Sequence, residues 1–582
     1  MRRAVLLVVL CFLMLPAAWA APNPFLDLDF EAPECTSGWF PWDPSFYPYD
    51  NVIDGTVAHS GTQSLRSHYT GPSPWDPYTT GGIRQVFPAA DAAGKRVRLG
   101  GWIRSESISE GYAGLGMLVF RTNGSVTWVD MSANGVTGTT PWTHYEVEMD
   151  IPADARTIHF GSELYGNGTA WFDDFEITVD GHRWHEGPAP HLLQPSPGHT
   201  DWLRQAAIPV TTTVAGNGFD DLQPLEDVIG DARIVSLGEA THGTREFFEM
   251  KHRMLELLAT EKGFTYFAME AGMPEAAQLN EYVLTGQGDP AELLRRMWYW
   301  PWYTQEVLDM ILWMREFNAS GRGPVQFWGF DMQLSEVAAE TVGAFLAQVE
   351  PDYLPTANAA FARIAAAEVR GFATAAEAAA VRSVFEHISG RRDVYLQTLP
   401  AEQVDWAIQN ARIILQDAEN LAGITLRDES MAANVEWILD HAPTGSKIVL
   451  WAHNLHVSRE PTLMGNYLTQ RYGDEMYVLG FAFGEGSYNA KGAYLELVSA
   501  EAPPPPPGSL ESFLRTAGLP RYILDLRHGN APHIWFEEPR KLRWNLGAVV
   551  NRCPYRAAAA ADLFDGLIWI DSTNPSQLLP SD

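Results

Sequence analysis

Beyond about residue 200, short apolar runs of strand length alternate with helical patterns. The runs are Arg233–Leu237, Phe264–Met269, Val325–Phe330, Ile448–Trp451, Tyr477–Phe483, Tyr522–Leu526 and Leu567–Ile570. Helical patterns separate the early runs, at Glu246–Lys262 and Glu306–Phe317. Strands that alternate with helices favour a doubly wound, mostly parallel sheet. We therefore expect an α/β domain over residues 199–582.

One long stretch of this region lacks strand patterns. Residues 335–441 are rich in alanine and poor in β-type runs. We interpret them as a helical insertion between two strands, which forms a cap over the sheet edge. Five consecutive prolines, Pro503–Pro507, predict an extended surface connector, because a proline run adopts a stiff polyproline conformation.

Residues 22–181 have a different pattern. Short alternating runs occur at Arg96–Ile103, Gly116–Arg121, His144–Ile151 and Thr169–Val179, and Gly, Pro, Asn and Ser interrupt them at close intervals. This spacing predicts an all-β jelly-roll sandwich. Residues 182–198, rich in His, Pro and Gly, are interpreted as a linker. The chain is thus expected to be multidomain.

The first twenty residues have the pattern of an export signal. Arg2 and Arg3 precede an apolar run, and Ala18-Trp19-Ala20 is suited to cleavage. Pro16 ends the apolar run before it reaches the roughly 20 residues of a membrane span. We expect a periplasmic or secreted protein with no stable membrane insertion.

The charge balance excludes some partners. The full chain has a formal charge of −32, and cleavage would remove two arginines and no acids. Such an acidic protein repels nucleic acid and anionic membrane surfaces, so nucleic acid is not an expected partner. Two cysteines would remain, Cys35 and Cys553, either as one disulfide or as two thiols.

Acids and imidazoles follow three of the predicted strands. Gly238-Glu239-Ala240-Thr241-His242-Gly243 comes after the first run, Glu270 ends the second, and Trp451-Ala452-His453-Asn454-Leu455-His456 ends the fourth. Ligands bind outside the carboxyl ends of strands in open α/β sheets. We therefore expect a site built from Glu239, His242, Glu270, His453 and His456. These groups are suited to activating a water molecule.

Other hydrolase signatures are missing. The chain has no GxSxG nucleophile elbow, no HExxH, no GxxxxGK phosphate loop and no dinucleotide-binding glycine pattern. Chemistry must then come from the His/Glu set. The alternative is a metal-dependent ester or peptide hydrolase, with a divalent ion on the same residues. For His453 and His456 to converge, the chain would have to turn into a loop or helix after His453, because a strand points them apart.

Several separated strings resemble the erythromycin esterase family over roughly residues 200 to 575. The strings, in order, are Leu237–Gly243, Glu246-Phe247-Phe248 with Lys251 and His252, Phe267–Glu270, Gly329–Met332, Arg427-Asp428 through Met431-Ala432 to Asn434, and Trp451–Asn454 with His456. The resemblance implies an α/β core with a helical segment. It also implies hydrolysis of esters, including macrolide lactones, by a histidine-activated water without a covalent intermediate or a cofactor.

Carried over residue by residue, the resemblance makes His242 the general base. Glu239 and Glu270 would orient and polarise that histidine or the water, and His453 and His456 would bind or polarise the ester. Lys251 and Asp331 are candidates for substrate binding. Lys251 stands where some macrolide-degrading members have arginine, and lysine cannot replace a bidentate arginine contact. A macrolide substrate is therefore one option, beside a glycan-linked ester.

Two other groups of residues have candidate roles. Arg427 and Asp428 are expected to form an ion pair, and the aromatic run Trp298–Tyr303 either lines a substrate pocket or packs in the core.

Strings in the first domain resemble carbohydrate-binding jelly-roll modules. They are Phe30-Glu31 leading to Gly38-Trp39, His59–Leu65, and Trp171–Phe175. The resemblance implies a carbohydrate ligand, since aromatic faces stack on sugar rings; the alternative is a purely structural sandwich. It also leaves open a third function, that of a non-catalytic sugar-binding or envelope-polysaccharide protein.

Overall fold

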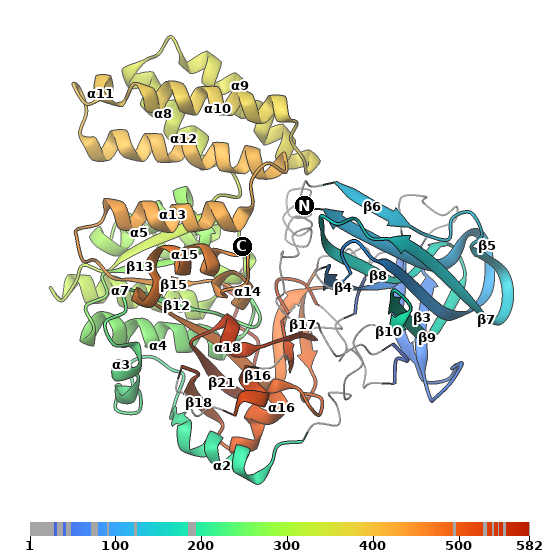
Figure 1. Cartoon of the computed structure of the whole chain (residues 1–582). Coiled ribbons are helices and arrows are strands. Elements are labelled where there is room, and N and C mark those ends of the chain that lie inside the picture. Colours follow the sequence, from blue (N-terminus) through green and yellow to red (C-terminus); the bar gives the residue numbers. More distant parts are fainter. Residues whose placement is uncertain are drawn as a thin grey trace.

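The computed structural model of the chain is shown in Figure 1. The structure describes residues 28–31, 39–41, 48–71, 80–89, 92–121, 125–183, 194–492, 496–527, 532–537, 540–544, 546–550 and 555–580. The predicted signal segment and both Cys35 and Cys553 lie outside these residues. No helix in the described ranges has the length and apolar character that crossing a bilayer requires.

The first domain is an antiparallel β-sandwich. Its strands are β1 (Phe40–Pro41), β2 (Tyr49–Asp54), β3 (Ser64–Tyr69), β4 (Ile83–Pro88), β5 (Arg96–Arg121), β6 (Val126–Val129), β7 (Val136–Asp150), β8 (Ala155–Gly166), β9 (Thr169–Val179) and β10 (His182–Arg183). Strand β5 belongs to both layers, because its first half pairs with β7 and β9 and its second half with β8.

Apolar side chains from both layers fill the sandwich. Phe30, Trp39, Phe160 and Phe175 are buried, and their rings contact one another at centroid distances of 5.3–6.0 Å. Trp39 therefore belongs to the core, whereas Trp128 is 64% exposed. The predicted β-sandwich is thus confirmed.

The second domain contains a mixed sheet ordered β11-β18-β21-β16-β12-β15-β13-β14. Its strands are β11 (Ile208–Pro209), β12 (Ile234–Leu237), β13 (Tyr266–Gly272), β14 (Gln326–Asp331), β15 (Ile448–Trp451), β16 (Met476–Lys491), β17 (Leu497–Ala502), β18 (Arg521–Asp525) and β21 (Gly566–Thr573). Neighbouring strands from β21 to β14 pair in parallel, whereas β18, β11 and the β17 arm pair antiparallel. A separate hairpin joins β19 (Arg540–Arg543) to β20 (Tyr555–Ala558).

Helices cover both faces of this sheet (Figure 1). They are α2 (Pro197–Ala206), α3 (Gln223–Ile229), α4 (Arg245–Glu261), α5 (Met273–Thr285), α6 (Pro290–Arg296), η2 (Trp300–Trp302), α7 (Gln305–Ala319), α14 (Asn454–Val457), α15 (Met464–Tyr472), η3 (Gly473–Glu475), α16 (Leu510–Leu514), η4 (Arg515–Ala517), α17 (His533–Phe536) and α18 (Ala560–Leu563). Successive strand residues enter different cores: Ile234 and Leu450 pack in one, Val235 and Val449 in the other. Burial on both faces explains why these strands are continuously apolar.

The interval between β14 and β15 contains only helices. These are α8 (Glu336–Val349), α9 (Leu354–Arg370), α10 (Ala375–Gly390), α11 (Arg392–Tyr395), α12 (Ala401–Leu421) and α13 (Arg427–His441). In Figure 1, α8 to α12 form a layer above α13, and α13 lies next to the sheet. This arrangement brings the first turn of α13 to the carboxyl ends of the strands.

Candidate active site

The loop between β12 and α4 carries the first string of site residues, Gly238 to Gly243. Both glycines are required by close packing. A Cβ on Gly238 would overlap the side-chain oxygen of Asn454, which accepts from the Phe481 backbone N–H at 2.9 Å. A Cβ on Gly243 would overlap the backbone of Asn489. The loop is therefore pressed against β16 and α14, and this fixes the direction of its side chains.

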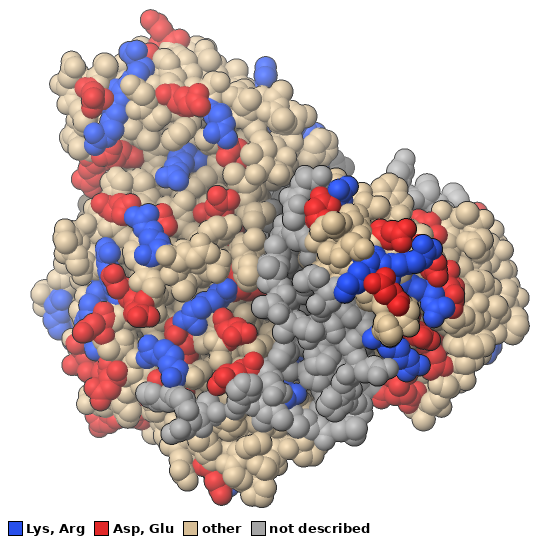
Figure 2. Space-filling model, viewed as in Figure 1, with Lys and Arg blue, Asp and Glu red and all other residues tan. Residues whose placement is uncertain are grey.

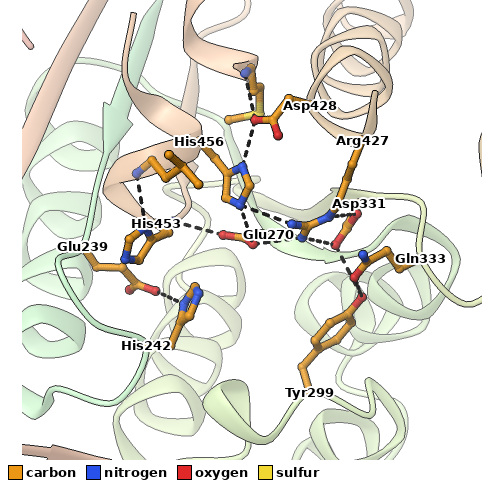
Figure 3. Close-up of polar contacts among 12 residues, drawn as sticks. Glu239, His242, Glu270, Tyr299, Asp331, Gln333, Arg427, Asp428, His453 and His456 are labelled. Carbon is orange, nitrogen blue, oxygen red and sulfur yellow. Dashed lines mark hydrogen bonds and ion pairs between the residues drawn. The ribbon is translucent and has the colours of Figure 1, made fainter. Parts of the chain in front are cut away.

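Glu239 and His242 face each other across this loop (Figure 3). The His242 Nδ1 atom lies 2.6 Å from Glu239 Oε1. Because the carboxylate accepts, Nδ1 carries the proton and donates. The remaining nitrogen, Nε2, then has a free lone pair. His242 is the more accessible of the two, with 13% of its side chain exposed against 0% for Glu239.

Two further groups hold the other oxygen of Glu239. Lys251 Nζ lies 2.5 Å away and the Trp451 indole N–H donates at 2.8 Å. Burial alone would raise the pKa of Glu239, but Lys251 and His242 outweigh it and lower that pKa. Burial lowers the pKa of Lys251 to about 8. Glu239 is therefore an ionised carboxylate with three donors, fixed beneath His242.

His453 lies beside His242, with the ring centroids 5.0 Å apart. It is the N-cap of α14, and its Nδ1 accepts the Leu455 backbone N–H at 3.1 Å. An accepting Nδ1 places the ring proton on Nε2. That Nε2 atom is buried and has no hydrogen-bond partner among the described residues. Burial lowers the pKa of His453 to about 3, so the ring is neutral at pH 7.

Glu270, at the end of β13, connects three separate segments. One oxygen accepts the His453 backbone N–H at 3.0 Å. The other accepts from Arg427 at 2.9 Å and lies 3.3 Å from His456 Nε2. Burial alone would raise the pKa of Glu270, but His456 and Arg427 hold it well below its usual value. Glu270 is therefore an ionised group that fixes the His453 backbone.

His456 lies between two carboxylates. Its Nδ1 is 2.8 Å from Asp428, and Nε2 faces Glu270. Burial alone would lower the pKa of His456, but Asp428 and Glu270 raise it well above the ordinary value. The two carboxylates therefore favour the protonated ring, and Arg427 Nη1 also lies 3.2 Å from Nε2. Asp428 also accepts the Met464 backbone N–H at 2.9 Å, which connects α13 to α15.

Arg427 also binds a second carboxylate besides Glu270. Its guanidinium is bound by Asp331 through two hydrogen bonds, of 3.1 and 2.6 Å. The Tyr299 hydroxyl lies 3.4 Å from an oxygen of Asp331 and 3.4 Å from an oxygen of Gln333. Asp331 is completely buried.

The structure brings every predicted site residue into this network. Some of these side chains keep a polar atom free for a substrate, and others bind only protein groups. His242 and His453 each keep one ring nitrogen without a protein partner among the described groups, whereas both nitrogens of His456 are occupied. Lys251 and Asp331, predicted to bind substrate, are fully buried and bind Glu239 and Arg427.

The expected pair of Arg427 with Asp428 is replaced by separate contacts. Consecutive helix residues point in different directions, so Arg427 reaches Asp331 and Glu270 while Asp428 reaches His456.

Sequence reasoning misses the contacts that three residues make to the site. Trp451 donates to Glu239, and Trp302 donates to the Glu270 backbone carbonyl at 3.0 Å while its ring meets the His242 ring edge-on at 6.0 Å. A Cβ on Gly547 would lie 3.9 Å from His242 Nε2. Among the sequence features, the aromatic run that contains Trp302 is the one that could have indicated such a contact.

The donor set fits a metal poorly. No group of three or more His, Cys, Asp or Glu residues within the described ranges is arranged to hold a metal ion. The carboxylate of Glu270 already binds a guanidinium, and Glu239 binds an ammonium.

Residues 259–573 match the model of the erythromycin esterase family. The chain belongs to this family. This membership, together with relatives that are named hydrolase and esterase, shows that the protein is an ester-hydrolysing enzyme. The YbfO protein of Bacillus subtilis, named a hydrolase, is 26% identical over 65% of this chain and 92% of its own length. Erythromycin esterase type II of Escherichia coli is 24% identical over 65% and 99%.

A solved structure has a similar fold. A Bacillus cereus protein, 26% identical, superposes with a TM-score of 0.59 over 67% of this chain and 100% of that one.

Proposed function

We propose that the protein hydrolyses a carboxylic ester or lactone with a water activated by His242, without a covalent intermediate. The observation that carries the proposal is the pairing of two adjacent imidazoles in opposite hydrogen-bonding states. His242 Nε2 has a free lone pair, because Nδ1 donates to Glu239. His453 Nε2 carries a proton, because Nδ1 accepts from Leu455. A base and a donor thus lie side by side.

In the first step, the water oxygen bonds to the ester carbonyl carbon while His242 Nε2 takes a water proton. A histidine is suited to this because its ordinary pKa is close to neutral pH. Glu239 stabilises the imidazolium that forms and keeps the proton on Nδ1. Lys251 and Trp451 keep Glu239 in place.

The carbonyl oxygen becomes an oxyanion, and His453 Nε2–H is the donor we assign to it. Donors aimed at developing charge are worth more in a buried site than in water. When the tetrahedral intermediate collapses, the carbon–oxygen bond breaks. The proton on His242 Nε2 passes to the leaving alkoxide, which restores the neutral base.

Glu270, His456 and Arg427 act as positioning residues. Glu270 fixes the His453 backbone at 3.0 Å, and Arg427 and His456 supply its positive partners. Three chain segments are thereby held in one geometry. Misplacement of a reacting group by about 1 Å can cost 10²-fold in rate.

The substrate class has two candidates. The relative named erythromycin esterase type II supports a macrolide lactone. The β-sandwich joined to the hydrolase domain supports a glycan-linked ester. The signal-like first twenty residues support hydrolysis in the periplasm or outside the cell.

The test is turnover of aryl esters, acetylated sugars and macrolides by purified protein, with and without a chelator. His242→Ala is the test variant, and His182→Ala, on the exposed strand β10, is the control. Activity that resists chelation, disappears in the test variant and persists in the control is expected. Activity that is lost on chelation and restored by a divalent ion would contradict the proposal and favour a metallohydrolase.

A second activity, carbohydrate binding by the sandwich, is supported by one observation. Tyr112 and Tyr165 lie side by side on β5 and β8, with ring centroids 5.1 Å apart and an angle of 30°. Next to them Glu163 has a buried oxygen without a hydrogen-bond partner in the described part of the chain. Aromatic platforms with a nearby carboxyl suit a sugar ring and its hydroxyls.

Polysaccharide binding by the full chain tests this activity. The double variant Tyr112→Ala/Tyr165→Ala should lose retention on a glycan array, while Trp128→Ala, on the exposed side of β6, should keep it. Equal retention by both variants would reject this surface as the binding face.

A further inference from the structure

A cavity of about 370 Å³ lies away from the histidine pair, against a different face of α4. The loop Val214–Gly216, the start of α7 and Gln577 line its other sides. Four residues of α4 line it, at helical spacing: Arg245, Glu249, His252 and Glu256. A cavity of this volume is in the range that holds small organic ligands.

The cavity is strongly acidic. Its lining contains the carboxylates of Glu249, Glu256, Glu306 and Asp309, against the single cationic side chain of Arg245, which lies 3.5 Å from Glu306. Protein groups hold each acid in place by donating to it. Thr213 donates to Glu249 at 2.5 Å, the Gly216 N–H to Glu256 at 2.7 Å, the Gln577 N–H to Glu306 at 3.0 Å, and Gln305 to Asp309 at 2.7 Å. These contacts leave lone pairs for a ligand, since an ionised carboxylate accepts about four hydrogen bonds.

His252 is the independent observation that indicates a ligand. The residue is only 8% exposed and lines the cavity. Its Nε2 atom has no hydrogen-bond partner in the part of the chain that the structure describes; the nearest acid, Glu256 Oε1, is 3.9 Å away. Burial lowers the pKa of His252 to about 4, so the ring is neutral at pH 7. A buried polar atom without a partner is costly, and a ligand would remove this cost.

The chemistry of the lining decides the ligand class. Several carboxylates repel an anion. A bare metal ion does not use 370 Å³, and the described residues offer no group arranged to bind one. An ammonium group donates three hydrogen bonds and carries one positive charge. We propose that this cavity binds an organic amine in its ammonium form, with Glu249 and Glu256 as counter-charges and His252 as a neutral acceptor.

Calorimetric titration of the full chain with 1,4-diaminobutane tests the proposal. We expect saturable binding that weakens as salt rises, and none with 1,4-butanediol, which has the same length without charge. Binding of calcium chloride in place of the diamine would overturn the assignment to an amine, and so would the absence of diamine binding at millimolar concentration.

Two variants locate the binding. Glu249→Gln keeps an acceptor for Thr213 but removes a charge, and His252→Phe keeps the ring volume while removing the unpartnered nitrogen. Each should weaken diamine binding about 10-fold or more, the scale of one hydrogen bond to a charged group. Glu386→Gln, an exposed position on α10, is the matched control. The unfolding temperature of His252→Phe should equal or exceed that of the wild type, which would show that the variant is folded. Unaltered diamine affinity in this folded variant would reject the site.

Discussion

At the scale of single residues, the neighbours of a histidine ring decide which nitrogen carries the proton. Glu239 accepts from His242, and the Leu455 N–H donates to His453. The same side chain is thus a base in one place and a donor 5.0 Å away, measured between ring centroids. His242 and His453 can therefore take different roles although both are histidines.

His453→Asn tests the donor role. Asparagine is also a good N-cap, so α14 is kept, but its shorter amide leaves the position of Nε2 empty. We expect kcat to fall by about 10²–10³-fold, as when one oxyanion donor is lost. The shape of the pH profile should stay, because His453, with a pKa of about 3, is already neutral. The control is His441→Asn, at the exposed end of α13. A wild-type kcat would exclude this role.

Lys251→Met tests how Glu239 is held. The variant fills a similar volume but leaves the Glu239 charge buried beside Trp451. Breaking a buried pair by removing one partner typically costs about 3–5 kcal/mol of stability. Urea unfolding should show this loss together with reduced kcat. Lys262→Met, at the C-terminal end of the same helix, should cost far less. An unchanged midpoint would show that the pair contributes little.

The sequence predicts which residues meet, but not their contacts. Glu239, His242, Glu270, His453 and His456 all lie at or just after the carboxyl ends of strands, and parallel strands bring those ends together. By contrast, the indole donor of Trp451 and the approach of Gly547 depend on side-chain rotamers and on segments far away in the chain. No local pattern contains that information.

At the scale of elements, close packing constrains the loop before α4. Gly243→Ala would place a methyl group on the Asn489 backbone. Because backbone cannot move aside cheaply, we expect a loss of about 1–3 kcal/mol and a clear fall in activity. Gly390→Ala is the control, since a Cβ there meets nothing within 4 Å. Thermal unfolding and turnover of both variants provide the measurement. Equal behaviour would mean that the loop can shift.

The positions of strands and helices are predictable here to within a few residues. Whether two neighbouring runs form one continuous strand is not. The pattern predicts Arg96–Ile103 and Gly116–Arg121 as separate strands, whereas both lie in the single strand β5. The glycine and serine residues between them suggest a break, yet pairing with β7, β8 and β9 keeps the chain extended. Similarly, the alanine-rich composition predicts helices for the insertion, but the partners of Arg427 follow from tertiary packing.

At the scale of the whole molecule, acidic and basic side chains are interspersed over the face shown in Figure 2. The formal charge is nevertheless −32. Stability in acid therefore depends on carboxylates that are paired in the folded state.

Asp221 is one such carboxylate. Burial alone would raise its pKa, but hydrogen bonds from Arg253 and Thr211 lower it to about 2. A folded pKa below the unfolded value stabilises the protein above pH 3.8, and this contribution is lost as pH falls toward 2. Asp221→Asn should therefore be less stable at pH 6 and show a shallower loss between pH 4 and 2. Asp474→Asn, at an exposed position, should follow the wild type in acid unfolding. Parallel curves for both variants would contradict the assignment.

Residues near position 576 brace the loop that contains the proposed base. Ser576 donates its backbone N–H to Gly243, Pro575 pairs with Thr244, and Asn489 donates to Ser576. Pro575 and Ser576 lie more than 300 residues after His242 in the chain. A nascent or prematurely stopped chain would hold every acid and imidazole of the site, yet its loop would be unsupported. A chain cut before Pro575 should therefore turn over substrate poorly, although it keeps every acid and imidazole of the site.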